Sequence, residues 1–184
     1  MRRRIGNLVA LAAVICGGML QSPAATAADA SFTLSSSAVA EGSDLPVYAV
    51  CPGKTTIPVS WANPPAGTKS YALLMDTVDK DNVTSYYWVV YDIPVKARSL
   101  PQGSTKIGYL GGNSKNRDIG YAPPCSQGPG THEYTIRLFA LSKKTPLSTL
   151  PKVSSSDVSG QMLLNAIANI KLGEADLHVT ATHL

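Results

Sequence analysis

The sequence is short of charged residues, cysteines and long apolar segments, and each shortage excludes a class of protein. Charged residues make up 15% of the 184 positions, below the roughly 25% of an average soluble domain, while hydrophobic residues reach 44%. Extended disorder is excluded, because disordered chains combine low hydrophobicity with high charge. Three cysteines are too few for a small domain built on disulfides. The length instead suits one domain with a substantial hydrophobic core.

The sequence also lacks the common signatures of catalysis and of metal or cofactor binding. No Gly-x-Ser-x-Gly elbow surrounds the loop serines Ser114 and Ser126, and no Gly-rich phosphate loop occurs. The scattered histidines and cysteines show no metal-ligand spacing. We therefore expect a protein that is not an enzyme and that has no bound metal or cofactor. A hydrolase that uses His132 with Cys125 or a loop serine is the alternative.

The first 27 residues have the order of a secretory signal peptide. Arg2–Arg4 supply a positive start, Leu8–Leu20 is an uncharged and mostly apolar run, and Ala25-Thr26-Ala27 offers small residues for cleavage. The apolar run has 13 residues. A membrane-spanning helix needs about 20, so we expect no stable membrane anchor. We expect cleavage after Ala27, a single domain over residues 28–184, and a secreted or periplasmic protein.

Two alternatives to this cleavage are an uncleaved membrane anchor and a lipoprotein signal with Cys16 as the lipidated residue. Loss of the signal changes the charge of the protein, because Arg2–Arg4 leave with it. The 16 basic residues fall to 13 against 12 acidic ones, so the net charge falls from +4 to +1. We therefore expect no nucleic-acid partner, because that interpretation depended on excess positive charge.

Cleavage would also leave an even number of cysteines, Cys51 and Cys125. In an oxidising compartment two cysteines most simply form one disulfide. Such a bridge closes a loop of about 75 residues and contributes roughly 3–4 kcal/mol in the chain-entropy model.

Short apolar segments separated by Gly and Pro predict a mostly β domain. Ser70–Met75 is nearly continuously apolar, which is typical of a strand buried on both faces. Tyr86–Ile93 is rich in aromatic and β-branched residues and predicts another central strand. A third strand, His132–Leu141, alternates, so that His132 and Tyr134 share one face and Glu133 lies on the other.

A single helix is predicted near the C-terminus, over Val158–Ile170, where apolar residues recur at helical spacing. Ser156 or Asp157 can cap its start and Gly173 can end it, before a last strand over Leu177–Thr182. The stretch from Pro101 to Gly130 carries many Gly, Pro and Asn residues. Loops of that length in a compact domain are usually functional.

Three further segments occur in a specific order and spacing. They are Val59-Ser60-Trp61 followed by Pro65–Leu73, Tyr87–Pro94 followed by Leu100–Gly103, and Gly120–Cys125 followed by Gly130–Leu141. Together they resemble the phosphatidylethanolamine-binding protein (PEBP) family, in particular its bacterial Raf-kinase-inhibitor-like branch, over most of residues 45–184. The resemblance implies a mostly β, PEBP-like β-sandwich with peripheral helices, including one C-terminal helix followed by a last strand.

The resemblance also implies a small pocket for phosphate-type head groups. In the family an Asp-Pro-Asp-x-Pro segment, a His before the central Trp-Val-Val strand and a Gly-x-His-Arg segment build this pocket. A donor His and backbone N–H groups can hold a phosphoryl oxygen, while Asp side chains orient donors or accept from the head group. Carried over to this sequence, the ligand-binding residues are Asp79, Tyr87, Tyr121, Pro123 and His132.

The sequence departs from the family pattern within this pocket. Thr77 and Val78 stand where the family has Asp and Pro, and Tyr87 stands where it has His. Glu133 replaces the Arg that follows the retained His132. A tyrosine can donate one hydrogen bond but cannot become a cation near neutral pH. These changes bear on anion binding and leave the fold inference intact.

We therefore expect an exported, non-catalytic PEBP-like binding protein with a partly degenerate pocket for a small anionic or phospho-head-group ligand. The alternative is a protein-interaction or inhibitor module, similar to the protease- or kinase-inhibitor members of the family, that has lost ligand binding and acts on a protein partner.

Overall fold

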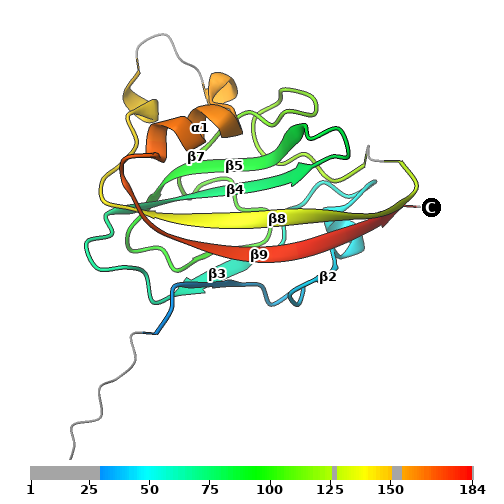
Figure 1. Ribbon diagram of the computed structural model, residues 1–184, viewed down its shortest axis with the longest axis horizontal. Coiled ribbons are helices and arrows are strands. Elements are labelled where there is room, and N and C mark those ends of the chain that lie inside the picture. The colour runs from blue at the N-terminus through cyan, green and yellow to red at the C-terminus, as the bar shows by residue number, and fades with distance from the viewer. Residues whose placement is uncertain (1–29, 126–127, 151–154, 184) are drawn as a thin grey trace, which may run out of the picture.

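Two β-sheets pack face to face in the computed structural model, which describes residues 30–125, 128–150 and 155–183 (Figure 1). The expected signal peptide and its cleavage site lie outside the described residues. The larger sheet has the strand order β2-β9-β8-β4-β5-β7 and the smaller sheet the order β1-β3-β6. The strands are β1 (Thr33–Ser35), β2 (Ser43–Asp44), β3 (Val59–Ala62), β4 (Ser70–Val78), β5 (Thr84–Pro94), β6 (Ser99–Leu100), β7 (Tyr109–Leu110), β8 (Gly130–Leu141) and β9 (Lys171–His183). The helical segments are η1 (Val47–Ala49), η2 (Leu147–Thr149), η3 (Ser155–Asp157) and α1 (Gly160–Ile167).

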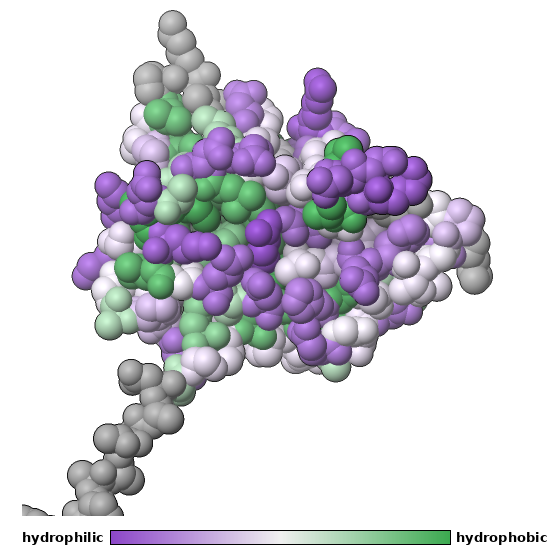
Figure 2. Space-filling view, in the orientation of Figure 1, coloured by the Kyte–Doolittle hydropathy of each residue, from purple (hydrophilic) through white to green (hydrophobic). Residues whose placement is uncertain are grey.

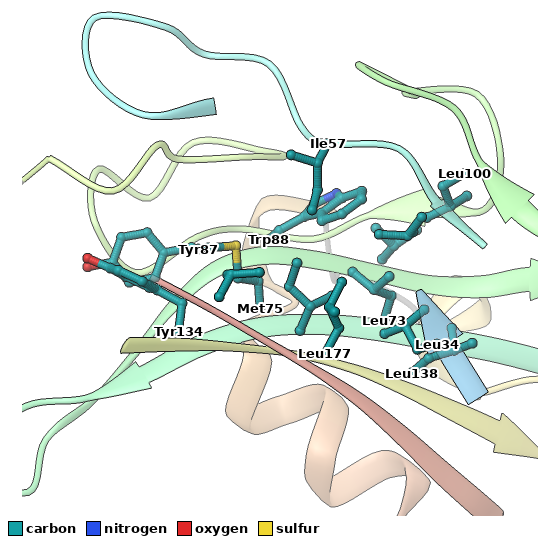
Figure 3. Close-up of a cluster of buried hydrophobic side chains, with 14 of the residues drawn as sticks. Leu34, Ile57, Leu73, Met75, Tyr87, Trp88, Leu100, Tyr134, Leu138 and Leu177 are labelled. Atoms are coloured by element: carbon teal, nitrogen blue, oxygen red, sulfur yellow. The ribbon is translucent and has the colours of Figure 1, made fainter. Parts of the chain in front are cut away.

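The main hydrophobic core fills the space between the two sheets. Leu34 and Leu100 come from the small sheet, and Leu73, Leu138 and Leu177 come from the large one (Figure 3). Each is buried, and full burial of such a side chain contributes about 1.5–3 kcal/mol relative to exposure. This packing confirms the predicted mostly β sandwich.

Strand β4 lies in the middle of the large sheet and is buried on both faces, as its apolar sequence predicts. One face contributes Leu73 and Met75 to the main core, and the other contributes Ala72 and Leu74 to a second core. Such a strand has no face in contact with water, so it needs no polar alternation.

The register between β4 and β5 shifts at two places, and at each of them β5 contains one extra residue. Met75 pairs with Trp88 and Asp76 pairs with Tyr86, so Tyr87 has no partner on β4 at this register shift. A bulge of this kind re-aims side chains. Here it lets both Tyr87 and Trp88 enter the main core while Tyr86 faces the second core.

The second core lies between the large sheet and α1, which covers one end of the outer sheet face (Figure 1). Ser159 caps this helix by accepting a hydrogen bond from the N–H of Met162, 3.2 Å away. The predicted caps were wrong, because Ser156 and Asp157 lie in η3.

On the visible face of the molecule, hydrophilic side chains separate the apolar areas (Figure 2).

Strand β9 begins well before the predicted Leu177. It starts at Lys171 and pairs antiparallel with β8 along the whole length of that strand. Gly173, predicted to end the helix, therefore lies inside the strand. Backbone pairing with β8 satisfies the N–H and C=O groups of this polar segment, which has little strand pattern of its own.

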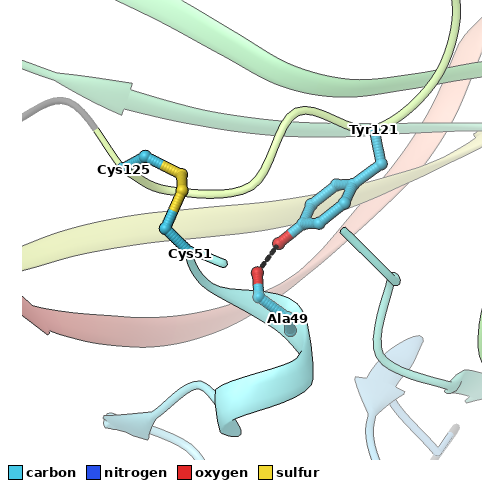
Figure 4. The surroundings of a disulfide bond; sticks show 4 residues. All are labelled: Ala49, Cys51, Tyr121 and Cys125. Carbon is cyan, nitrogen blue, oxygen red and sulfur yellow. Dashed lines mark hydrogen bonds between the residues drawn. A yellow bond between two sulfur atoms is a disulfide. The ribbon is translucent and has the colours of Figure 1, made fainter. Parts of the chain in front are cut away.

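The sulfur atoms of Cys51 and Cys125 lie at disulfide distance, and the two Cα atoms are 5.4 Å apart (Figure 4). The bridge joins the segment that follows η1 to the loop that precedes β8. Next to it, the hydroxyl of Tyr121 donates a 2.6 Å hydrogen bond to the carbonyl of Ala49. These two links hold the long loop against η1.

Candidate ligand-binding site

A hollow of about 420 Å³ lies where the turn between β4 and β5 meets the start of β8. The residues that line it come from both segments and are Thr77, Val78, Asp79, Lys80, Asp81, Thr131, His132 and Glu133. The structure thus brings together Asp79 and His132, two of the five ligand-binding residues predicted from the sequence. We call this feature the Asp79–His132 hollow.

The carboxylate of Asp79 organises the turn at this hollow. Its Oδ1 atom accepts hydrogen bonds from the N–H groups of Asp81 and Val83, each at 2.9 Å. The turn includes Asn82 at a positive φ of 62°, which asparagine tolerates better than most residues. In the part of the chain that the structure describes, the second oxygen of Asp79 has no hydrogen-bond partner, so it is the atom that a ligand can reach.

His132, at the start of β8, is half-buried and also lines the hollow. Its Nε2 lies 3.1 Å from the carbonyl oxygen of Gly128, and because a carbonyl can only accept, Nε2 carries the hydrogen. The ring Nδ1 then accepts in the neutral imidazole and donates when the ring is protonated. His183 lies beside it, with ring centroids 5.9 Å apart.

The charge of the hollow is predominantly negative. Asp79, Asp81 and Glu133 line it, against Lys80, whose Nζ is 2.8 Å from the Asp81 carboxylate. Because Lys80 is paired with Asp81, the carboxylates of Asp79 and Glu133 remain, and they favour a cationic group on a ligand. The hydroxyl of Thr77, which replaces a family Asp, donates at 2.6 Å to the carbonyl of Glu133 and so ties β4 to β8.

The other predicted ligand residues lie elsewhere. Tyr87 is fully buried and packs edge to face on Tyr134, with 5.1 Å between centroids. Burial, reinforced by Tyr87, raises the pKa of the Tyr121 phenol, which holds Ala49. Pro123 lines a separate hollow near the disulfide. The structure therefore does not gather the five predicted residues around one hollow.

Two buried polar atoms close to this end of the core were not singled out from the sequence. The Tyr134 hydroxyl and the His183 Nε2 are both shielded from solvent, and the His183 Nε2 has no hydrogen-bond partner among the described residues. Burial, then the neighbouring Tyr87 phenol and a hydrogen bond with it, raises the pKa of Tyr134. The alternation of β8 could have indicated Tyr134, because it shares the face of His132. His183 had no such signal, because only the β8–β9 register places it opposite Gly130.

A third group of polar side chains lies between α1 and the outer face of the large sheet. Arg137 contacts the Asp76 carboxylate through Nη2, and the Tyr86 hydroxyl donates to Oε1 of Gln161 at 3.0 Å. Burial raises the pKa of Asp76, although Arg137 opposes that shift. Within residues 30–125, 128–150 and 155–183, no cluster of His, Cys, Asp and Glu side chains could hold a metal ion.

A two-sheet sandwich with a small polar hollow at its strand ends defines the class of this protein, a β-sandwich of the binding-protein type. A family model described as "Phosphatidylethanolamine-binding protein" matches residues 35–182. The chain belongs to the phosphatidylethanolamine-binding protein family, which confirms the resemblance seen in the sequence.

Two relatives illustrate the similarity. The UPF0098 protein of Aquifex aeolicus is 36% identical over 127 residues, which cover 66% of this chain and 74% of the relative. The UPF0098 protein YbcL of Escherichia coli is 30% identical over 162 residues, which cover 78% of this chain and 86% of the relative.

Solved structures show the same fold. CT736 from Chlamydia trachomatis, a PEBP homologue, superposes with a TM-score of 0.72 at 24% identity over 85% of this chain and 100% of that one. The crystal structure of E. coli YbcL superposes with a TM-score of 0.72 at 23% identity over 84% of this chain and 100% of that one.

Proposed function

We propose that this protein is an exported binding protein that holds a small phospho-head-group ligand in the Asp79–His132 hollow without converting it chemically. One observation carries the proposal. Asp79 and His132, the acid and the imidazole that this chain retains from the family's ligand motifs, both line one hollow, and this supports the proposal.

The charges of the hollow favour a head group that carries an amine as well as a phosphoryl group. Asp79 and Glu133 offer carboxylate oxygens to an ammonium group, and the His132 ring can donate an N–H to a phosphoryl oxygen. Inorganic phosphate lacks the ammonium group, so its negative charge is repelled by these carboxylates and no attraction offsets that repulsion. Phosphoethanolamine is therefore the appropriate probe.

Export is part of the same proposal. Two exposed cysteines at disulfide distance suit an oxidising compartment, because cytosolic thiols are kept reduced. The N-terminal sequence has the order of a secretory signal. Among the described residues, no helix is long and apolar enough to cross a membrane.

NMR titration tests ligand binding directly. Phosphoethanolamine should shift the ring resonances of His132 and the amides of Asp79 and Glu133, and inorganic phosphate should shift them less. His132→Gln and Glu133→Gln should weaken the response, while His178→Gln, an exposed histidine on β9, should leave it unchanged. Absence of any shift at millimolar phosphoethanolamine would refute ligand binding at this hollow.

A second candidate function is a protein-interaction module. Val78 and Val83 flank the turn that carries Asp79, and they are 58% and 56% exposed. Exposed apolar side chains beside a polar rim are common at interfaces. If a protein partner docks here, Val78→Asp with Val83→Asp should abolish cross-linking to that partner in the envelope fraction, while Val47→Asp should not.

A further inference from the structure

A second hollow, of about 470 Å³, surrounds the Cys51–Cys125 disulfide. Both cysteines are exposed residues and both line this hollow. The residues that line the hollow are Cys51, Lys54, Lys115, Asn116, Pro123 and Cys125, and none of them lines the Asp79–His132 hollow. We call this feature the disulfide hollow.

The charge of the disulfide hollow is positive. Lys54 and Lys115 are its ionisable side chains, and no carboxylate belongs to the lining that the structure describes. Neither lysine makes an ion pair with the described residues, in contrast to Lys80 and Lys171. Two unneutralised ammonium groups beside a disulfide attract anions and favour negative charge on its sulfur atoms.

Both lysines stand on well-held segments of backbone. The buried side chain of Asn113 accepts hydrogen bonds from the N–H groups of Lys115 and Asn116, at 3.0 and 3.1 Å. The Nζ of Lys115 also lies 5.5 Å from the centroid of the Tyr87 ring. On the other side, the N–H of Thr55, next to Lys54, donates to the carbonyl of Tyr48 at 3.1 Å.

We propose that the Cys51–Cys125 disulfide is an exchange site for small anionic thiols. Lys54 and Lys115 draw the anionic thiol into the disulfide hollow and stabilise the thiolate that leaves. Exchange rates depend on access to the disulfide and on the stability of the departing thiolate, and nearby lysines stabilise thiolates. The exposed cysteines address the first condition and the two lysines of the hollow address the second.

The reaction proceeds in two balanced steps. The incoming thiolate attacks one sulfur of the disulfide, a mixed disulfide forms, and the electron pair of the broken S–S bond stays on the other cysteine as a thiolate. A second molecule of the same thiol attacks the mixed disulfide and leaves as a small disulfide. Two thiols are then oxidised, and Cys51 and Cys125 are both reduced.

Reduction removes one of the two links between η1 and the loop before β8. The hydrogen bond from Tyr121 to Ala49 remains (Figure 4).

Rates of reduction by three thiols of different charge test the proposal. The probes are 3-mercaptopropionate, 2-mercaptoethanol and cysteamine, with each rate corrected for its thiolate fraction. Alkylation and mass spectrometry after an acid quench count the reduced cysteines. In the native protein at low salt, the anionic thiol should react about three- to tenfold faster than the cationic thiol, and high salt should reduce that ratio.

Variants assign the preference to the two lysines. Lys54→Gln combined with Lys115→Gln should abolish the preference for the anionic thiol. Lys143→Gln changes an exposed lysine that does not line the disulfide hollow, and it should preserve the preference. Because the charge preference of the wild type is measured without any variant, a misfolded variant leaves the test intact. Equal or reversed rates, a preference that survives the double substitution, or two free thiols in untreated protein would each overturn the proposal.

Discussion

The rings of Tyr87 and Tyr134 meet edge to face at a centroid distance of 5.1 Å, at the end of the main core (Figure 3). Tyr87 occupies the position at which the family has a ligand-binding His, and it is fully buried. Its ring fills the core and does not line the Asp79–His132 hollow. Of the two histidine positions in the family's ligand motifs, only His132 lies at the hollow, together with Asp79.

Tyr134→Phe should change the stability less than Tyr121→Phe does. The buried Tyr134 hydroxyl interacts with the Tyr87 phenol, so its removal loses that contact but also removes a desolvation cost, and the net change in the free energy of unfolding should stay below about 1 kcal/mol. Tyr121→Phe is the matched comparison, because it loses the bond to Ala49 and should lower that free energy by about 1 kcal/mol. Urea denaturation measures both. A larger loss in Tyr134→Phe than in Tyr121→Phe would contradict this balance.

The stability contributed by Asp76 should fall as pH rises. Burial raises its pKa above the ordinary 3.8, so the folded state binds the proton more tightly than the unfolded state. Its contribution is therefore largest below 3.8 and is lost as pH rises through the folded-state pKa. The free energy of unfolding of the wild type relative to Asp76→Asn should decrease over that range and then level off. An increase would show that attraction to Arg137 outweighs burial.

Joint substitution of Cys51 and Cys125 by Ser should lower the free energy of unfolding by roughly 3–4 kcal/mol in the chain-entropy model. The two cysteines are 74 positions apart, so the bridge restricts a long loop in the unfolded chain. Urea denaturation without reductant gives the difference. With a thiol reductant present, the wild type and the double variant should become equally stable, and a remaining difference would mean that the serines themselves destabilise the fold.

Gly160→Ala should destabilise the protein although alanine favours helices. A Cβ at this position would collide with the Tyr86 ring, on which the first turn of α1 rests. We expect a loss of about 1–3 kcal/mol, typical of overpacking. Asn165→Ala, on the exposed side of the same helix, loses an exposed 3.0 Å hydrogen bond from Gln161 but gains helix propensity, so it should be close to neutral. Thermal denaturation of both variants makes the comparison, and equal midpoints would contradict the close packing.

The central strands could be predicted because their sequences carry the signal locally. Ser70–Met75 is apolar on both faces because β4 lies between two cores. Strand β9 could not be predicted over its full length, because Lys171–Ala175 is polar and is strand only through pairing with β8. The prediction of the helix cap was wrong for a related reason. Several serines near Ser159 can cap a helix, and the close packing of Gly160 on Tyr86 fixes the start of α1 at Ser159.

The candidate site divides in the same way. Asp79 and His132 could be chosen from the sequence, since both belong to motif segments at strand ends. The burial of Tyr87 could not be predicted from the sequence, because a bulge between β4 and β5 turns its side chain toward the core. Lys54 and Lys115 line one hollow beside the disulfide although they belong to chain segments that are distant in sequence.

The amino-acid sequence by itself determined the family, the mostly β character and the two cysteines that pair, because motif order, local hydrophobic pattern and cysteine number are properties of the chain. Tertiary structure alone decided which polar side chains share a hollow and what charge each hollow has. Charge at a site is a sum over neighbours in space. Only folding brings Asp79 to Glu133 and Lys54 to Lys115.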